Sequence, residues 1–428
     1  MKHRYLPWTG LALVAVWLAC AGGAGAGEDA AAVLKQARTL FDQTHYAESV
    51  ALCNQVLETD PNSVEALIRR GTAYREEGER EQALQDLNRA VELDPTSIWA
   101  WMERGHAYDE WAQPARARSD YDQALTLCDQ ALARDPSDTD TLRLRARTRG
   151  WRGHYDEALE DYNRLLAQSP DDAWLLWLRG ELQLTRGAYA EAVTDYTRCL
   201  ELDPNDVAAY VQRGLAHEGE GKLDLAGQDF DSALAANPDL GVGHLNRGVF
   251  RCQQGDLLGG LEDFNEAVRL LPGSYNAFSD RGNVYHDLGR YQDALEDYAQ
   301  ALALAPDFAT GYYNRGNTYM EMGNNQAALT DYARAVELDP KMVNAYANRA
   351  GVYISLGAAA EAVADCDRAL AVDPNSALAY MKRGKANANL SRWAEARHDF
   401  EQASTLDPNG PFGDYARSNL ERLSQMGH

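Results

Sequence analysis

The sequence predicts an all-α protein assembled from about eleven copies of one helical pair. Eleven of its fourteen prolines recur every 34 residues, with a single interval of 41. An arginine and an aspartate that lie 16 residues apart keep the same period through ten copies. Because a fixed period of 20–50 residues is typical of repeat architectures, we expect a stacked array and not a globular domain.

Three recurrent positions define the repeat. The prolines that close the copies are Pro61, Pro95, Pro136, Pro170, Pro204, Pro238, Pro272, Pro306, Pro340, Pro374 and Pro408. The arginines are Arg70, Arg104, Arg145, Arg179, Arg213, Arg247, Arg281, Arg315, Arg349 and Arg383, and glycine follows them except at Ala146 and Ala350. The aspartates are Asp86, Asp120, Asp161, Asp195, Asp229, Asp263, Asp297, Asp331, Asp365 and Asp399. Residues 28–408 thus hold eleven units of 34 residues and one insertion of seven.

Each copy contains two amphipathic helical patterns. In the first, a bulky residue, the recurrent glycine and the residue three beyond it share one face. In the second, an alanine, an aromatic four later and an alanine three beyond that do the same, as at Ala294, Tyr298 and Ala301. Burying a large side chain stabilises by roughly 1.5–3 kcal/mol, but one copy cannot cover its own outer face. We therefore expect the copies to stack, with each proline ending a second helix.

The pattern resembles the tetratricopeptide repeat. The copy at 345–374 shows the spacing of that family at Ala345, Tyr346, Arg349, Ala350, Tyr353, Gly357, Ala362 and Pro374. The resemblance implies a right-handed α-solenoid superhelix of helix–turn–helix units. It also implies that the first helices line a concave groove, and that the protein is a non-catalytic scaffold which holds a peptide segment of a partner protein there.

The period divides the chain into five parts. Residues 1–26 form a leader, and residues 28–61 form an atypical unit that caps the array. The tandem array occupies 62–408, and a seven-residue duplication (DQALTLC, DQALARD) lies within 122–135. Seven residues make about two helical turns, so a longer second helix would keep its apolar stripe aligned. Residues 409–428 are predicted to form a solvating helix over the last unit.

The first residues are typical of an export signal. A basic start at 2–4 precedes an uncharged run, and Ala24-Gly25-Ala26 is suited to signal peptidase. Cys20, which follows Leu18-Ala19, supports a second interpretation as the lipidated residue of a bacterial lipoprotein, and an uncleaved anchor is a third. We expect an exported protein, periplasmic or envelope-associated, that contacts a membrane only through this N-terminal lipid or anchor.

Charge and cysteine content narrow the function further. The chain carries a net charge of −24, which repels phosphate backbones and argues against nucleic-acid binding. Its six cysteines include no C-x-x-C pair, so neither a zinc site nor a disulfide framework is indicated. Cys53, Cys199 and Cys366 stand in core columns and are predicted to be small buried side chains.

No catalytic motif accompanies the repeats. His217-Glu218 lacks the second histidine of H-E-x-x-H, and Gly221-Lys222 lacks the serine or threonine of a phosphate loop. Ten copies of an arginine and an aspartate suit a ladder of ion pairs better than ten active sites. We expect these pairs to be exposed, contributing about 0–1 kcal/mol each. The sequence thus predicts no enzyme, cofactor or metal site.

The first candidate binding patch lies in the C-terminal half. It comprises Asn246, Asn283, Asn314, Asn317, Asn348, Lys382 and Lys385. An asparagine amide offers a donor and an acceptor, which match a peptide main chain. By resemblance, Asn317, Asn348 and Lys382 stand at positions of the carboxylate clamp of chaperone-binding family members, although Tyr313 and Leu378 replace two of its lysines. Asp280 interrupts the asparagine series, and the alternative is that these asparagines are solvated filler.

The second candidate patch lies in the N-terminal half. It comprises Trp99, Arg143, Arg147, Trp174 and Trp177. Aromatic residues with arginine are the usual composition of an interface hot spot or of a stacking platform for a sugar. This patch supports the alternative function of a periplasmic envelope-assembly or glycan-binding factor. The competing interpretation is that large residues simply pack between helices.

Overall fold

The computed structural model describes residues 26–42 and 45–427, and these residues form 23 α-helices with no strand. The prediction of an all-α repeat protein is confirmed. Within this part of the chain, no helix combines the length and the apolar character needed to cross a membrane. The predicted signal peptide up to Gly25, including Cys20, lies outside the described residues.

The helices alternate as first and second members of eleven hairpins, followed by one further helix. The first helices are α1 (Ala26–Asp42), α3 (Val64–Glu76), α5 (Ile98–Glu110), α7 (Thr139–Arg152), α9 (Ala173–Arg186), α11 (Val207–Gly219), α13 (Gly241–Gln253), α15 (Tyr275–Asp287), α17 (Ala309–Glu321), α19 (Val343–Ser355) and α21 (Ala377–Asn389). The second helices are α2 (Tyr46–Thr59), α4 (Arg80–Leu93), α6 (Pro114–Arg134), α8 (Tyr155–Gln168), α10 (Tyr189–Leu202), α12 (Leu223–Ala236), α14 (Leu257–Leu270), α16 (Tyr291–Leu304), α18 (Asn325–Leu338), α20 (Ala359–Val372) and α22 (Trp393–Leu406). The last helix is α23 (Pro411–Gln425).

The hairpin boundaries follow from proline and from polar caps. Every second helix ends two residues before its proline, as α10 does at Leu202 before Pro204. Several first helices begin behind a capping side chain, and Asp206 accepts a hydrogen bond from the Ala209 amide at the start of α11. Such caps satisfy backbone donors that the first helical turn leaves without partners.

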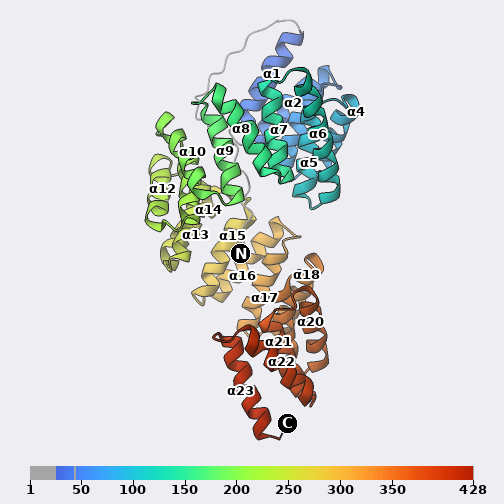
Figure 1. The fold of residues 1–428 in the computed structure, drawn as a ribbon, viewed down its shortest axis with the longest axis vertical. Coiled ribbons are helices and arrows are strands. Elements are labelled where there is room, and N and C mark those ends of the chain that lie inside the picture. The colour runs from blue at the N-terminus through green and yellow to red at the C-terminus, as the bar shows by residue number, and fades with distance from the viewer. Residues whose placement is uncertain (1–25, 43–44, 428) are drawn as a thin grey trace. The chain divides into compact units, whose positions relative to one another are not determined.

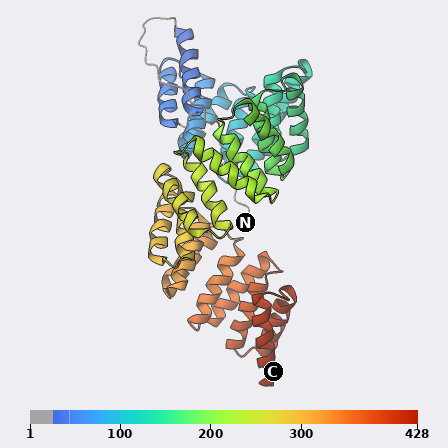
Figure 2. The ribbon, with the colours of Figure 1, turned by 90° about the vertical axis from the view of Figure 1, so that its left-hand side faces the viewer.

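The chain divides into two compact units. The N-terminal unit ends at Pro238 and the C-terminal unit begins at Asp239. Each unit is a row of antiparallel helix pairs (Figures 1 and 2). In the C-terminal unit, α13, α15, α17 and α19 each contact the next first helix, whereas no comparable contact joins consecutive second helices. The first helices therefore lie on the inner, concave side of this unit.

Glycine brings the two helices of a hairpin together. A Cβ built on Gly316 would lie 2.9 Å from Cε1 of Tyr332, closer than real side chains allow. The same approach, at 2.8–3.0 Å, recurs in eight hairpins, at Gly71, Gly105, Gly180, Gly214, Gly248, Gly282, Gly316 and Gly384. In seven of these hairpins a buried aromatic of the second helix fills the space that the glycine leaves, as the sequence predicted, and Leu87 does so opposite Gly71.

Two hairpins fill this space differently. Ala37 and Ala350 replace the glycine, and the residues 16 positions later are Cys53 and Cys366 in place of a bulky side chain. All four side chains are buried, with no measurable exposed fraction. In these two hairpins a larger first residue is matched by a smaller second one, which explains these cysteines as packing residues. In a third hairpin, Ala146 keeps the buried aromatic Tyr162 16 positions later. The five cysteines of the described chain are all free, and Cys53, Cys199 and Cys366 are buried, as predicted.

The recurrent arginine and aspartate form a buried ion pair in each of ten hairpins. In nine of them, Nε and Nη2 of the arginine donate to the two carboxylate oxygens at 2.6–2.9 Å. In the last hairpin, Arg383 holds Asp399 at 2.7–3.2 Å. The aspartates are only 1–5% exposed, so the expectation of solvent-exposed, weak pairs was wrong. Breaking a buried pair by removing one partner typically costs about 3–5 kcal/mol.

The third nitrogen of the arginine ties its hairpin to the preceding one. Nη1 of Arg281 donates to Asn265 in the previous second helix at 3.1 Å. Equivalent bonds reach Asn54, Asn88, Asp129, Asn163, Thr197 and Asp367. Ala299 and Ala333 stand at this position before Arg315 and Arg349, so their side chains offer no acceptor. The arginine therefore sets register both within and between hairpins.

Two helices depart from the repeat. Helix α6 has 21 residues where the other second helices have 14, and its buried side chains extend to Cys128 and Leu132. It contains the seven-residue duplication, so the extra residues lengthen the helix by about two turns. Helix α23 packs on α21 and α22 and buries Ala416 and Leu423.

Replacing Arg315 with Met should strip the buried Asp331 carboxylate of its cation and lower the local unfolding free energy of α17 and α18 by about 3–5 kcal/mol. Amide hydrogen exchange of these two helices measures the change. Arg334→Met is the matched control, because Arg334 and Glu337 form an exposed pair whose loss should cost about 0–1 kcal/mol. Equal effects of the two substitutions would contradict the structural importance of the buried pair.

Adding a methyl group at Gly316 tests the packing rule. Gly316→Ala should destabilise the protein by about 1–3 kcal/mol, because the new Cβ overlaps Tyr332. The same substitution made in a Tyr332→Cys background should be neutral or stabilising, since cysteine leaves room and alanine favours helix by about 1 kcal/mol. Urea denaturation of the four variants gives the coupling. Identical costs in both backgrounds would show that the aromatic does not require glycine.

Candidate binding face

The asparagine patch lies on first helices of the C-terminal unit. Asn246 is on α13, Asn283 on α15, Asn314 and Asn317 on α17, and Asn348 on α19. Lys382 and Lys385 follow on α21. All are half-buried except Lys385, which is exposed. We call this surface the first-helix face: the side chains two positions before and one position after the recurrent glycine on α13, α15, α17, α19 and α21.

A hydrogen-bonded group of three side chains joins α15 to α17. Nδ2 of Asn314 donates to Oδ1 of Asn283 at 2.9 Å, and the hydroxyl of Tyr298 donates to the same oxygen at 2.8 Å. Tyr298 is the buried aromatic of its hairpin. Its hydroxyl emerges beside the first-helix face, where Asn283 gives it an acceptor.

The same group recurs one hairpin later. Nδ2 of Asn348 donates to Oδ1 of Asn317 at 2.9 Å, and the hydroxyl of Tyr332 donates to that oxygen at 2.7 Å. Tyr313 adds a hydroxyl acceptor, 3.2 Å from Nδ2 of Asn348. The asparagines are therefore side-chain links between successive hairpins and not only solvated filler.

Each amide pair keeps one donor and one acceptor unused by the protein. No described residue bonds Nδ2 of Asn283 or Asn317, or Oδ1 of Asn314 or Asn348, and none of these atoms is among the buried polar atoms without partners. They are therefore open to solvent. A peptide group carries the complementary acceptor and donor, so each pair can bind one stretch of extended main chain.

Asn246 does not join this series within the C-terminal unit. Its Nδ2 donates to the Val242 carbonyl of its own helix at 3.0 Å. The residues of α15 and α13 that correspond to the pair Asn314 and Asn283 are Asp280 and Val249. The amide ladder thus consists of two complete pairs, Asn283–Asn314 and Asn317–Asn348.

Two lysines follow the ladder without an acidic partner. Nζ of Lys382 would lie 3.1 Å from a Cβ on Gly351, the residue in the position that Asn317 holds one hairpin earlier. Burial and the nearby charge of Lys385 lower the pKa of Lys382. Nζ of Lys385 lies 5.9 Å from the ring centre of Tyr415. In the described chain no carboxylate pairs with either ammonium, so this end of the face can take an anion.

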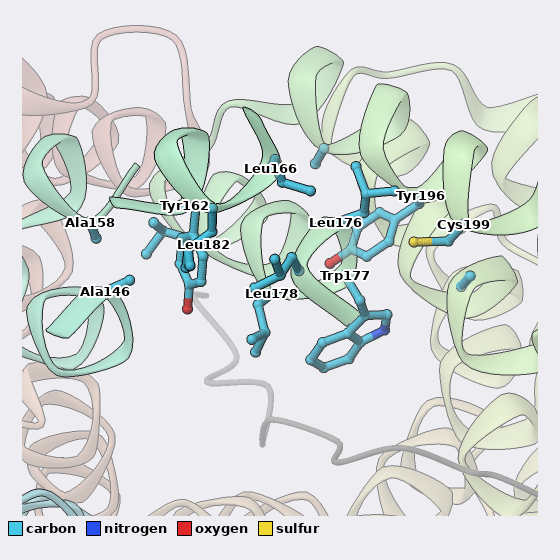
Figure 3. Close-up of a cluster of buried hydrophobic side chains, with 14 of the residues drawn as sticks. Ala146, Ala158, Tyr162, Leu166, Leu176, Trp177, Leu178, Leu182, Tyr196 and Cys199 are labelled. Carbon is cyan, nitrogen blue, oxygen red and sulfur yellow. The ribbon is translucent and has the colours of Figure 1, made fainter. Parts of the chain in front are cut away.

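The tryptophans of the second patch are largely packing residues. Trp177 is 6% exposed and lies in the core beside Leu178 and Tyr196 (Figure 3). Trp174 stacks on it with ring centres 5.6 Å apart, and is the more exposed of the two at 38%. Trp99 packs in a separate core, donates to Glu103 at 3.2 Å and lies under the Arg69 guanidinium.

The arginines of the second patch already have contacts. Arg143 pairs with Asp140 one turn away, and Arg147 lies 4.8 Å over the Trp151 ring. Burial raises the pKa of the neighbouring Glu181 to about 7, an effect that Arg147 partly offsets. The structure therefore brings Trp174 and Trp177 together, but it gives the two arginines partners of their own.

Sequence reasoning missed the tyrosines that hold the ladder. Tyr298 and Tyr332 follow Asn283 and Asn317 by 15 residues, a spacing visible in the sequence. In the N-terminal unit, Tyr121 and Tyr196 stand at equivalent positions, but His106 and Glu181 replace the asparagine. Both of these hydroxyls are buried without a partner. The asparagine–tyrosine pairing therefore distinguishes the C-terminal unit.

This architecture defines a class of protein, a helical-repeat scaffold with a polar inner face. Comparison by sequence then identifies the family. Residues 71–110 and 282–323 match the family described as TPR repeat. Families described as tetratricopeptide repeat match the segments 309–342; 143–207, 189–240 and 367–411; and 100–130 and 343–376. The chain belongs to the tetratricopeptide repeat family. Proteins of this family are generally non-catalytic scaffolds that bind protein or peptide partners.

Solved structures with a similar fold include yeast Tom70, MamA and YrrB. Tom70 is 15% identical with a TM-score of 0.47, and the match covers 94% of this chain and 96% of Tom70. MamA is 23% identical with a TM-score of 0.36, over 39% of this chain and 92% of MamA. YrrB, titled a TPR protein with an unusual peptide-binding site, is 21% identical with a TM-score of 0.37, over 44% and 97%. No curated protein matches the chain.

Removing a ladder amide should orphan a buried hydroxyl. Asn283→Ala takes away the acceptor of Tyr298 and should destabilise the protein by about 1–3 kcal/mol, but much less in a Tyr298→Phe background. Urea denaturation of the four variants measures this coupling. Asn246→Ala is the control and should change stability by about 0.5 kcal/mol or less. Additive effects at Asn283 and Tyr298 would refute the bond. Alanine in this ladder is therefore not a neutral probe of binding.

Proposed function

We propose that the protein is an exported, non-catalytic scaffold that holds an extended peptide segment of a partner protein along the first-helix face of its C-terminal unit. One observation carries the proposal. Two successive amide pairs, Asn283–Asn314 and Asn317–Asn348, each leave a donor and an acceptor open to solvent. The two lysines of α21 lie at the next position of the same face.

The amide pairs are fixed before any ligand binds. Oδ1 of Asn283 and Oδ1 of Asn317 each accept two hydrogen bonds, one from a tyrosine and one from the asparagine of the next hairpin. These bonds hold both asparagines of each pair in one geometry. Rotamer entropy lost on binding weakens an interaction by about 0.5–1.5 kcal/mol for each side chain that must be immobilised. Preorganised amides avoid most of this cost, so they favour recognition of main chain over recognition of one particular side chain.

The two lysines of α21 favour a bound segment that carries a negative charge. The chain carries a net charge of −24, so an unpaired cation pair at Lys382 and Lys385 stands out electrostatically from most of the protein. It would attract a carboxylate, either the C-terminus of a peptide or an acidic side chain. The resemblance of Asn317, Asn348 and Lys382 to a carboxylate clamp supports the same chemistry.

Export rests on the first residues of the sequence. The basic start, the uncharged run and Ala24-Gly25-Ala26 support a signal peptide, with Cys20 as the lipidation site in the lipoprotein alternative. A periplasmic or envelope-associated location follows. The buried free cysteines are compatible with such an oxidising compartment, because burial raises the pKa of thiols such as Cys53 to about 11 and so disfavours the reactive thiolate.

The alternative function as a glycan-binding or envelope-assembly factor would use the tryptophan–arginine patch. That patch offers Trp174 as its more exposed ring, while Trp177 is buried and Arg143 and Arg147 are engaged. No observation on this patch matches the open amide pairs of the first-helix face, so we favour peptide binding.

A library of synthetic dodecapeptides with free C-termini tests the proposed function. The full chain should enrich peptides that end in, or contain, a carboxylate near the last positions. Lys382→Gln should weaken binding of the enriched peptides about tenfold or more, since a hydrogen bond to a charged group contributes about 1.5–3 kcal/mol. Isothermal titration calorimetry gives the dissociation constants.

Lys341→Gln provides the control, because Lys341 is an exposed lysine in a loop of the same unit. It removes the same charge and should leave the dissociation constants within about twofold. The proposal fails if no peptide is enriched, or if Lys382→Gln and Lys341→Gln behave alike. Competition by soluble oligosaccharide, with sensitivity to Trp174→Ala, would support the alternative function instead.

A further inference from the structure

The amide ladder ends on a mismatched position at each side. In the complete pairs, a residue two positions before the glycine bonds a residue one position after the glycine of the preceding hairpin. At the C-terminal end this pair is Lys382 and Gly351, and at the N-terminal end it is Asp280 and Val249. Glycine and valine offer no polar side chain, so each end leaves one charged group without the partner that the ladder supplies elsewhere.

Asp280 is the group left over at the N-terminal end. It is half-buried, and no described residue makes a hydrogen bond or an ion pair with its carboxylate. Its oxygens are not among the buried polar atoms that lack partners, so they reach solvent. Burial raises the pKa of Asp280 to about 7, which shows how poorly its negative charge is compensated.

The Asp280 carboxylate also acts on a neighbouring thiol. Burial raises the pKa of Cys252 to about 11, and the negative charges of Asp256 and Asp280 add to this effect. Arg247 and Arg251 neutralise Asp263. The described chain brings no group of three metal-ligating side chains together, so this end favours an organic cation over a metal ion.

Three hairpin steps separate the two ends of the amide ladder. Asp280 is on α15 and Lys382 on α21, and the first helices between them contact one another in sequence. Packed helices have axes about 8–10 Å apart, so three steps span roughly 24–30 Å. An extended chain covers about 3.3 Å per residue, which makes this span roughly eight residues long.

We propose that the first-helix face selects a peptide with a cationic group at Asp280 and a carboxylate at Lys382 and Lys385, roughly eight residues apart. The inference rests on the proposed function and adds a second subsite to it. Since opposite charges occupy the two ends, a segment with the same groups at the wrong spacing cannot satisfy both. The polarity of the face thus selects the orientation and the length of the bound segment.

Substitution at Asp280 tests the second subsite with the dodecapeptide library. The unaltered chain should enrich lysine or arginine about eight positions before the carboxylate. Asp280→Asn should abolish that preference and weaken the selected peptides about tenfold, and Asp280→Lys should favour an acidic residue at the same position. Copies of the peptides with amidated C-termini distinguish a terminal carboxylate from an acidic side chain as the group bound by the lysines.

Asp287→Asn is the matched control, because Asp287 is an exposed aspartate on the same helix. It should leave both preference and affinity within about twofold. Asp280→Asn removes a buried charge and should melt at the same temperature or higher at pH 8, so weaker binding would not reflect unfolding. This follows because a raised carboxyl pKa means that the ionised form is less stable in the folded state than in the unfolded state.

The possible results separate the two proposals. A carboxylate preference that depends on Lys382, without any basic preference, would overturn the second subsite and leave the proposed function standing. A basic preference that survives Asp280→Asn would also overturn it. Loss of both preferences in the unaltered chain would overturn both proposals.

Discussion

The structure depends on the buried, bidentate pair between an arginine of the first helix and an aspartate of the second. The planar guanidinium matches a carboxylate in one orientation, so the pair fixes how the two helices face each other. Where the third nitrogen reaches an acceptor on the preceding hairpin, the same residue also fixes the step between hairpins, as Arg281 does through Asn265. Glycine-to-aromatic packing then fills the space between helices held in this register.

A constant register makes equivalent positions on successive first helices neighbours. This is why Asn314 meets Asn283 and why Asn348 meets Asn317, each across 31 residues of chain. The binding face that we propose is built where the repeat changes its side chains without changing its backbone. On this face an unpaired carboxylate lies at one end, two complete amide pairs lie in the middle and two unpaired lysines lie at the other end. The two ends of a repetitive scaffold therefore carry opposite charges.

The sequence predicted the fold well because the recurrent residues are the ones that end the helices and fill the space between them. Proline marked the ends of the second helices, and the recurrent alanines and aromatics marked their buried faces, as at Ala294 and Tyr298. The burial of individual side chains was harder to predict from the sequence. The period shows that Asp331 recurs but not that it is buried, and the column of Trp177 does not show that its indole lies inside the core. Contacts between hairpins, such as the bond between Tyr298 and Asn283, depend on the turn from one repeat to the next. A single copy does not encode that turn.

The structure of the full chain bound to its best dodecapeptide addresses the central claim most directly. Our account predicts an extended peptide that crosses α15, α17, α19 and α21, with main-chain carbonyls within hydrogen-bond distance of Nδ2 of Asn283 and Asn317. Its carboxylate should lie at the lysines of α21. A peptide bound on the second helices, in the N-terminal unit, or as a helix that leaves these amides in water would contradict the account.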